Sequence, residues 1–144
     1  MIVCRQATKD DLPKLVELAL RSNQPIESIP TLMFLCEDTE EGKVLAMVGI
    51  YLSVPGMVVV GGFIVPPEVY ADRELRRAVA DDLRVFVHGW MLLHNCKAYV
   101  CEISKRNTRM QRWFEQRGGQ RYAKKNGSYW YMMKLDAALE GRAA

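Results

Sequence analysis

The stretch FIVPPEVYADRELRRAVADDLRVFVHGWMLLHNCKAYVCEISKRNTRMQRWFEQRG, residues 63–118, decides the fold of this chain. A short apolar strand is predicted over residues 98–103, and a helix over residues 108–117 ends at Gly118. A strand, a long crossover helix and a second strand together predict a parallel pair with a right-handed connection. The long helix, over residues 73–93, follows from one apolar stripe with steps of three or four: Leu75, Val79, Leu83, Phe86, Trp90 and Leu93.

The flanking sequence adds strands on both sides of this unit. Residues 2–6 predict a strand and residues 9–21 an amphipathic helix, which Thr8 and Asp11 begin at capping-box spacing. A short helix is predicted over residues 26–32, and a meander of strands over 33–37, 43–52 and 57–65. Gly61-Gly62 interrupts the last of these, which indicates a bulge or a close backbone approach. Residues 120–124 and 129–135 predict a hairpin around Asn126-Gly127.

This order predicts an α/β chain with a central mixed sheet of about six to seven strands, flanked by helices on both faces. A length of 144 residues fits one domain, which we place at residues 1–136, with a loose tail over 137–144. No signal peptide is visible, and the apolar run over residues 57–67 is too short to span a bilayer, so we expect a cytoplasmic protein without a membrane partner. The four cysteines and two histidines lack metal-ligand spacing, so we expect no metal.

Charge is distributed unevenly, although the net charge is only +3. Lysine and arginine concentrate in the second half of the chain, where an anion could bind. A solvated charged surface is the commoner explanation for such runs. No recognised nucleic-acid motif accompanies the charges, so the sequence argues against nucleic acid as a partner.

Three segments resemble the GNAT superfamily of N-acetyltransferases, and the resemblance covers nearly the whole chain. CRQATKDDLPKLVEL, residues 4–18, is similar to the usual first strand and helix of that family. The Val-Pro-Pro-Glu of residues 65–68 resembles the motif after its fourth strand, and residues 107–118 resemble its Asn-led final helix. The resemblance implies a GNAT-like fold, acetyl-CoA as acyl donor and an amine as acceptor.

The same resemblance implies a cofactor site. Backbone groups of Phe63, Ile64 and Val65 would hold pantetheine, and the segment 32–34 would line the acceptor side. Phe114 stands where the family often has a tyrosine that acts as general acid. Glu102, on the strand after the long helix, is one candidate general base, and a surface residue of an edge-facing strand is the commoner alternative. The phosphates and the nearby arm would be held by four side chains: Arg73, Arg76, Arg77 and Asn107.

Two departures from the family pattern bear on activity. The family wraps the pyrophosphate in a glycine loop, whereas residues 71–77 contain no glycine and include Asp72 and Glu74. These acids suit a helix N-terminus without a ligand, so a capping role competes with phosphate binding, as it does for Asn107. Phe114 has no proton to donate. Tyr70, Tyr99, Tyr122 or Cys101 could replace a tyrosine there, and the sequence selects none of them.

Two functions therefore stay open. The first is an acyl-CoA-dependent N-acetyltransferase with impaired or lost catalysis. The second is a non-catalytic GNAT-shaped binding or structural protein, because small GNAT-like proteins of short-tailed phages look similar and also lack the glycine loop. In that case a virion or assembly role, protein partners or a homo-oligomer would be expected, with the basic segment 105–117 and the exposed aromatics Tyr129, Trp130 and Tyr131 as a partner surface. Packing of the same aromatics on the sheet as a hairpin is the commoner alternative.

Overall fold

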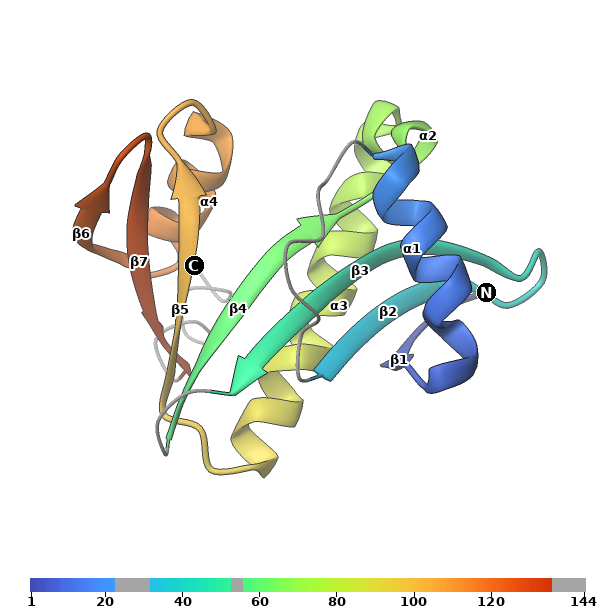
Figure 1. The fold of residues 1–144 in the computed structure, drawn as a ribbon, viewed down its shortest axis with the longest axis horizontal. Coiled ribbons are helices and arrows are strands. Elements are labelled where there is room, and N and C mark those ends of the chain that lie inside the picture. Colours follow the sequence, from blue (N-terminus) through green and yellow to red (C-terminus); the bar gives the residue numbers. More distant parts are fainter. Residues whose placement is uncertain (23–31, 53–55, 136–144) are drawn as a thin grey trace. The chain divides into compact units, whose positions relative to one another are not determined.

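The computed structural model describes residues 1–22, 32–52 and 56–135 (Figure 1). The helix predicted over 26–32 and the tail over 137–144 lie outside these residues, except that Leu32 begins a strand. The remaining predicted elements are confirmed to within two residues, and one short helix, α2, was not predicted. The elements are β1 (Ile2–Gln6), a 3-10 turn (Lys9–Asp11), α1 (Leu12–Arg21), β2 (Leu32–Asp38), β3 (Lys43–Leu52), β4 (Met57–Ile64), α2 (Pro67–Ala71), α3 (Arg73–Leu93), β5 (Ala98–Ser104), α4 (Thr108–Gln116), β6 (Gln120–Lys125) and β7 (Ser128–Lys134).

The strands form one seven-stranded mixed sheet in the order β1-β2-β3-β4-β5-β7-β6. β4 and β5 are parallel, and the long helix α3 connects them. The pairs β1–β2, β2–β3, β5–β7 and β6–β7 are antiparallel. The predicted mixed α/β architecture is therefore confirmed.

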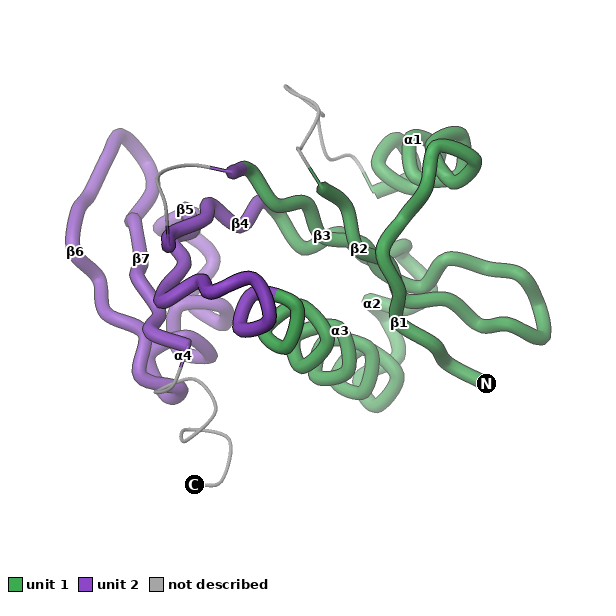
Figure 2. The backbone as a smooth tube through the Cα atoms, turned by 90° about the horizontal axis from the view of Figure 1, so that it is seen from below, with its two compact units in different colours: residues 1–51, 62–90 green, residues 52–61, 91–144 purple. Residues whose placement is uncertain are grey.

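The chain divides into two compact units, coloured separately in Figure 2. Unit 1 comprises residues 1–51 and 62–90, and unit 2 comprises residues 52–61 and 91–144. β4 crosses the boundary, so that its first five residues belong to unit 2 and its last three to unit 1.

Helices cover both faces of the strands in unit 1. Successive side chains on a strand point to opposite faces, so neighbouring apolar residues of β2 pack against different helices. Leu35 of β2 packs with Leu15 and Leu18 of α1 in one apolar cluster. Its neighbour Phe34 turns the other way and makes edge-to-face ring contacts with Phe86 and Trp90 of α3, at centroid distances of 6.0 and 5.4 Å. One strand thus anchors a helix on each side.

The buried stripe of α3 differs from the predicted one. Val79, Leu83, Val87 and Met91 are buried at steps of four, whereas Leu93 is 84% exposed and Phe86 is 37% exposed. The predicted stripe, with alternating steps of four and three, follows one line along a straight helix. The observed steps of four each turn the buried row by about 40° around the helix axis, so the two rows share only Val79 and Leu83.

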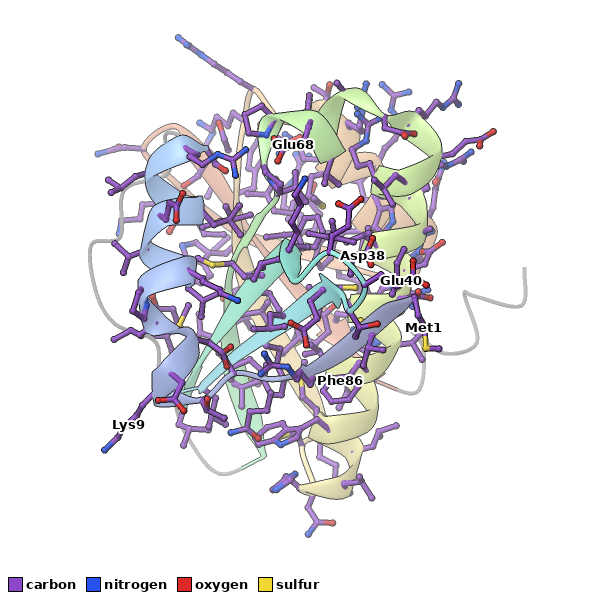
Figure 3. The ribbon with its side chains drawn as sticks, turned by 90° about the vertical axis from the view of Figure 1, so that its right-hand side faces the viewer. Met1, Lys9, Asp38, Glu40, Glu68 and Phe86 are labelled. Atoms are coloured by element: carbon purple, nitrogen blue, oxygen red, sulfur yellow. The ribbon has the colours of Figure 1, made fainter. Side chains whose placement is uncertain are left out.

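Hydrogen bonds and ion pairs hold the N-terminal residues of unit 1 in place. The Asp11 carboxylate accepts a bond from the Thr8 backbone N–H at 2.7 Å and completes the predicted capping box. Arg5 binds the same carboxylate with two nitrogens, at 2.8 and 2.7 Å. The terminal amino group of Met1 lies 3.6 Å from Asp38 and 3.7 Å from Glu40 (Figure 3).

Candidate functional site

The parallel ladder between β4 and β5 is short. It comprises three residue pairs and ends at Val59 and Val100, although β4 continues to Ile64 and β5 to Ser104. Among the described residues, β5 beyond Val100 pairs with β7 alone. Beyond Val59 and Val100, β4 and β5 are therefore not paired with each other.

Glycines follow the end of the ladder on the β4 side. A Cβ built on Gly62 would meet no atom within 4 Å, so its lack of a side chain is not explained by packing. No described protein atom makes the close approach that the sequence suggested at Gly62, and an approach by a ligand stays a prediction. Val60, beside this glycine pair, was not named from the sequence, whereas Gly61 was singled out together with Gly62, and Cys101 on β5 was named only as a possible proton donor.

The three backbone positions predicted for pantetheine lie at the end of β4 in unit 1. Ile64 is 9% exposed and packs into the α1 cluster, and Phe63 is half-buried. The Val65 carbonyl accepts a hydrogen bond from the Ser22 hydroxyl at 2.9 Å. The role of these residues toward a cofactor stays a prediction.

The N-terminus of α3 is capped by a side chain of the protein itself. The Asp72 side chain accepts a hydrogen bond from the Leu75 backbone N–H at 3.1 Å, and its carbonyl accepts from Arg76 N at 2.8 Å. Asp72 is thus a helix cap, and Glu74 adds a second carboxylate in the first turn. The capping alternative raised by the sequence is confirmed for Asp72.

The three arginines of this helix differ in their surroundings. Arg76 donates to the Tyr70 carbonyl at 2.7 Å, and its guanidinium lies 4.9 Å from the centre of the Tyr70 ring. Arg73 and Arg77 are exposed and have no ion-pair partner among the described residues. Because they are four residues apart, these two side chains share one face of α3. They are the arginines of this set that a phosphate can reach without breaking an internal contact.

Asn107 begins α4 in unit 2. Its side-chain oxygen accepts a hydrogen bond from the Met110 N–H at 3.1 Å, so the N-cap role is confirmed. The buried Gln111 ties the same helix to the end of β5, because its amide nitrogen donates to the carbonyls of Ser104 and Lys105 at 3.0 and 3.1 Å. These bonds fix the start of α4 relative to β5.

Phe114 is an aromatic core residue of unit 2. It is 8% exposed, and its ring centroid lies 6.1 Å from Tyr99, 5.1 Å from Trp113 and 6.1 Å from Tyr131. The Tyr131 hydroxyl donates to Glu115 at 2.8 Å. Tyr131 is therefore buried rather than part of an exposed aromatic surface, which corrects that part of the partner-surface prediction. Phe114 as a cofactor contact stays a prediction.

The candidate acids and the candidate base differ in burial and in hydrogen bonding. Burial raises the pKa of Cys101 to about 12, so this thiol stays protonated at neutral pH and is a weak acid. Tyr99 is buried, and burial raises the pKa of the exposed Tyr122. Glu102 lies on β5, an inner strand, and accepts a hydrogen bond from the Ser128 hydroxyl. No residue is singled out as a general acid or base.

The predicted site residues divide between the two units. Phe63, Ile64, Val65 and the three arginines belong to unit 1, whereas Asn107 and Phe114 belong to unit 2. Within the described part of the chain, no group of three His, Cys, Asp or Glu side chains is placed to hold a metal ion. No helix among those residues is long and apolar enough to cross a membrane.

Comparisons with known proteins agree on the fold. The sequence matches no protein-family profile and no curated protein. Solved structures do match: a GNAT acetyltransferase from Streptococcus pneumoniae has 12% identity and a TM-score of 0.73, over 93% of this chain and 99% of that one. PaiA N-acetyltransferase from Thermoplasma acidophilum, solved in complex with coenzyme A, has 10% identity and a TM-score of 0.72 over the same shares. The ribosomal-protein-alanine N-acetyltransferase from Escherichia coli has 14% identity and a TM-score of 0.70 over 94% of each chain. At such identities the likeness shows the fold alone, and the described chain has the fold of the GNAT N-acetyltransferases.

Proposed function

We propose that this chain binds an acyl-coenzyme A and transfers the acyl group to an amine at a low rate. The observation that carries the proposal is the end of the β4–β5 ladder at Val59 and Val100. An extended pantetheine arm, which carries two amide groups, can use backbone donors and acceptors that the two strands do not use for each other. The fold shared with acetyltransferases, one of them solved with coenzyme A, supports this use of the strands.

Side chains, rather than the backbone of a glycine loop, would hold the phosphates. Arg73 and Arg77 are exposed on one face of α3 and can pair with phosphate oxygens. Asp72 and Glu74 oppose them, because carboxylates near a helix N-terminus repel a pyrophosphate. We therefore expect weaker binding of coenzyme A than a glycine loop would give.

The chemistry would be direct transfer. The amine nitrogen attacks the thioester carbonyl carbon, the C–N bond forms, and the C–S bond breaks. Coenzyme A leaves as thiolate, and the proton that the attacking nitrogen loses passes through water to that thiolate. Phe114 supplies no proton, and general acid catalysis typically contributes ~10²–10⁴-fold to such a step. The expected rate is correspondingly low, with KM for the acyl donor set by the arm and the arginines.

The test combines transfer and binding. Release of free coenzyme A thiol from acetyl-CoA is followed with a panel of amines, including peptide N-terminal amines, lysine and polyamines. The variant Arg73→Glu with Arg77→Glu should weaken acetyl-CoA binding at least roughly tenfold, which is about 1.4 kcal/mol. Lys9→Glu with Lys14→Glu makes the same charge change at exposed positions of the N-terminal helix region and should leave the affinity unaltered. Equal affinity in both variants would show that α3 does not hold the phosphates.

A non-catalytic role is the second candidate, and the structure of the α3 N-terminus favours it. Asp72 occupies the position where a phosphate would accept hydrogen bonds, and Arg76 is committed to Tyr70. A GNAT-shaped binding or assembly protein, such as a phage virion component, does not have to bind phosphate. Both the Asp72 cap and the contact of Arg76 with Tyr70 are compatible with that role. Sedimentation in the native extract distinguishes the two, because this candidate requires co-migration with another protein and the enzyme does not.

A further inference from the structure

Unit 2 carries a strong excess of positive charge. Its described residues include ten lysines and arginines against two acids, Glu102 and Glu115. Both acids have hydrogen-bond partners inside the unit, Ser128 and Tyr131 respectively. The two acidic side chains can therefore balance only a small part of the positive charge of this unit.

Several of these cations are gathered by contacts rather than scattered. The Arg121 guanidinium lies 3.7 Å from the centre of the Tyr129 ring, and the Lys105 ammonium lies 5.4 Å from the same centre. Lys124 is the strand partner of Tyr129. Three positive charges from two separate segments therefore surround one aromatic side chain.

The helix α4 extends this group. Arg121 reaches from β6 to the side-chain oxygen of Gln111 at 3.4 Å, so strand and helix are in contact. Arg109 and Arg112 are exposed, three residues apart, on the side of α4 away from Phe114. We call Lys105, Arg106, Arg109, Arg112, Arg121 and Lys124 the basic face.

Most of the basic face has no acidic partner. Within the described residues its one ion pair is Arg121 with Glu115, at 3.6 Å and with both side chains more than two-fifths exposed. Like charges held close together repel, and a bound polyanion removes that repulsion while releasing its own counterions. The face is complementary in charge to a chain of phosphates.

We propose that the basic face binds the phosphate backbone of a single-stranded nucleic acid. Arginine guanidinium groups pair well with phosphate. In proteins that bind single strands, the bases stack on aromatic side chains that lie beside the positively charged residues. The half-buried Tyr129, whose ring lies against Arg121 and near Lys105, provides such a ring. The sequence argued against nucleic acid because it contains no motif, and the contacts around Tyr129 are what it did not show.

A lipid surface fits less well. Membrane-surface binding combines cations with exposed aliphatic side chains on the same face. In the described part of unit 2, the exposed large aliphatic residues are Leu52, Leu92 and Leu93, which lie at the end of β3 and at the end of α3. None belongs to the segments that carry the basic face.

The experiment measures binding of a fluorescent oligothymidylate of about 20 nucleotides to the full chain by anisotropy. If about four phosphates are contacted, raising the salt from about 50 to about 200 mM should weaken binding about 50-fold. Arg112→Glu with Lys124→Glu should weaken binding at least roughly tenfold, because each removed phosphate contact lowers affinity. Lys9→Glu with Lys14→Glu, the matched charge change in unit 1, should leave binding unaltered.

Other outcomes would overturn the proposal. No binding of the oligothymidylate at low salt, or equal loss in both double variants, would contradict it. Tighter binding to vesicles containing anionic phospholipid than to the oligonucleotide would assign the face to a membrane instead. Displacement of the oligonucleotide by free coenzyme A would assign the face to the cofactor. Because Arg112 and Lys124 are not in the proposed cofactor site, unaltered acetyl-CoA binding by their variant separates this test from that of the proposed function.

Discussion

The Asp72 carboxylate accepts a hydrogen bond from the Leu75 backbone N–H at 3.1 Å and so occupies the N-terminus of α3. The free N–H groups of a first helical turn are the usual place for a phosphate. Here a side chain of the protein itself takes one of them. Asp72 therefore limits how a nucleotide pyrophosphate can be held by this helix.

Replacing Asp72 by asparagine separates its cap from its charge. Asparagine is an equally good N-cap, so Asp72→Asn should change the free energy of unfolding by less than about 0.5 kcal/mol. Removing the negative charge should tighten acetyl-CoA binding roughly fivefold, or about 1 kcal/mol. Thermal unfolding and calorimetric titration measure the two effects. Equal affinity in Asp72→Asn and the unaltered protein would mean that no phosphate comes near α3.

Gly62 offers a second test of the cofactor position. Because a Cβ at this residue would meet no atom within 4 Å, Gly62→Ala should fold with unaltered stability. An acyl-CoA arm that approaches the β4 backbone would meet the new methyl group, so binding should fall roughly tenfold, or about 1.4 kcal/mol. A Gly62→Ala protein that binds acetyl-CoA as well as the original would move the arm away from this part of β4.

The sequence predicted the order of the elements and the mixed sheet because helix and strand periods are local properties. It did not predict α2, since a helix of only five residues, which begins at the second of two prolines, carries too little periodic signal. The sequence predicted Arg73, Arg76 and Arg77 alike as residues that would hold the phosphates. Only the contact of Arg76 with Tyr70 distinguishes them, and that contact depends on the turn between α2 and α3. Likewise, the end of the β4–β5 ladder depends on pairing between distant segments, so the Gly61-Gly62 pair could only hint at it.

Stability in acid should depend on Asp11. The hydrogen bonds from Arg5 and from the Thr8 N–H hold the pKa of Asp11 well below its usual range. This contribution is fully present above the unfolded pKa of about 3.9, and it is lost as the pH falls through the folded value. Asp11→Asn should thus cost about 1–3 kcal/mol at neutral pH and flatten the fall in stability below about pH 4.

Asp10 provides the control for this prediction. It is exposed, adjacent to Asp11, and has no ion-pair partner among the described residues. Asp10→Asn should change stability by less than about 0.5 kcal/mol at any pH. If both variants follow the same curve in urea unfolding between neutral and acid pH, the Arg5–Asp11 pair does not control acid stability.

Cys4 and Cys36 should form a disulfide on mild oxidation. They are direct partners on β1 and β2, and their sulfurs lie 3.2 Å apart. Hydrogen bonds from Ala7 N to the Met33 carbonyl and from Thr39 N to the Met1 carbonyl mark the bonded pairs of this ladder. By alternation, the two cysteines form a non-bonded pair, in which side chains come closest.

Hydrogen peroxide supplies the oxidant for this test. The hydrogen bond with Cys36 lowers the pKa of Cys4, which favours its thiolate as the group that attacks peroxide. Two thiols lose two hydrogens, the S–S bond forms, and peroxide is reduced to two waters. Mass spectrometry of the digested protein should find the peptide pair linked through Cys4 and Cys36. Linkage of either residue to Cys96 or Cys101 instead would contradict the pairing of β1 with β2.

Binding of acetyl-CoA tests the account most directly. The purified full chain is titrated with acetyl-CoA by calorimetry, with free coenzyme A as the companion ligand. We expect both ligands to bind in the micromolar to high-micromolar range, because the pantetheine arm and two arginines contribute while Asp72 and Glu74 oppose the phosphates. An absence of heat at millimolar concentrations of both ligands would contradict it and leave the non-catalytic role as the function of this fold.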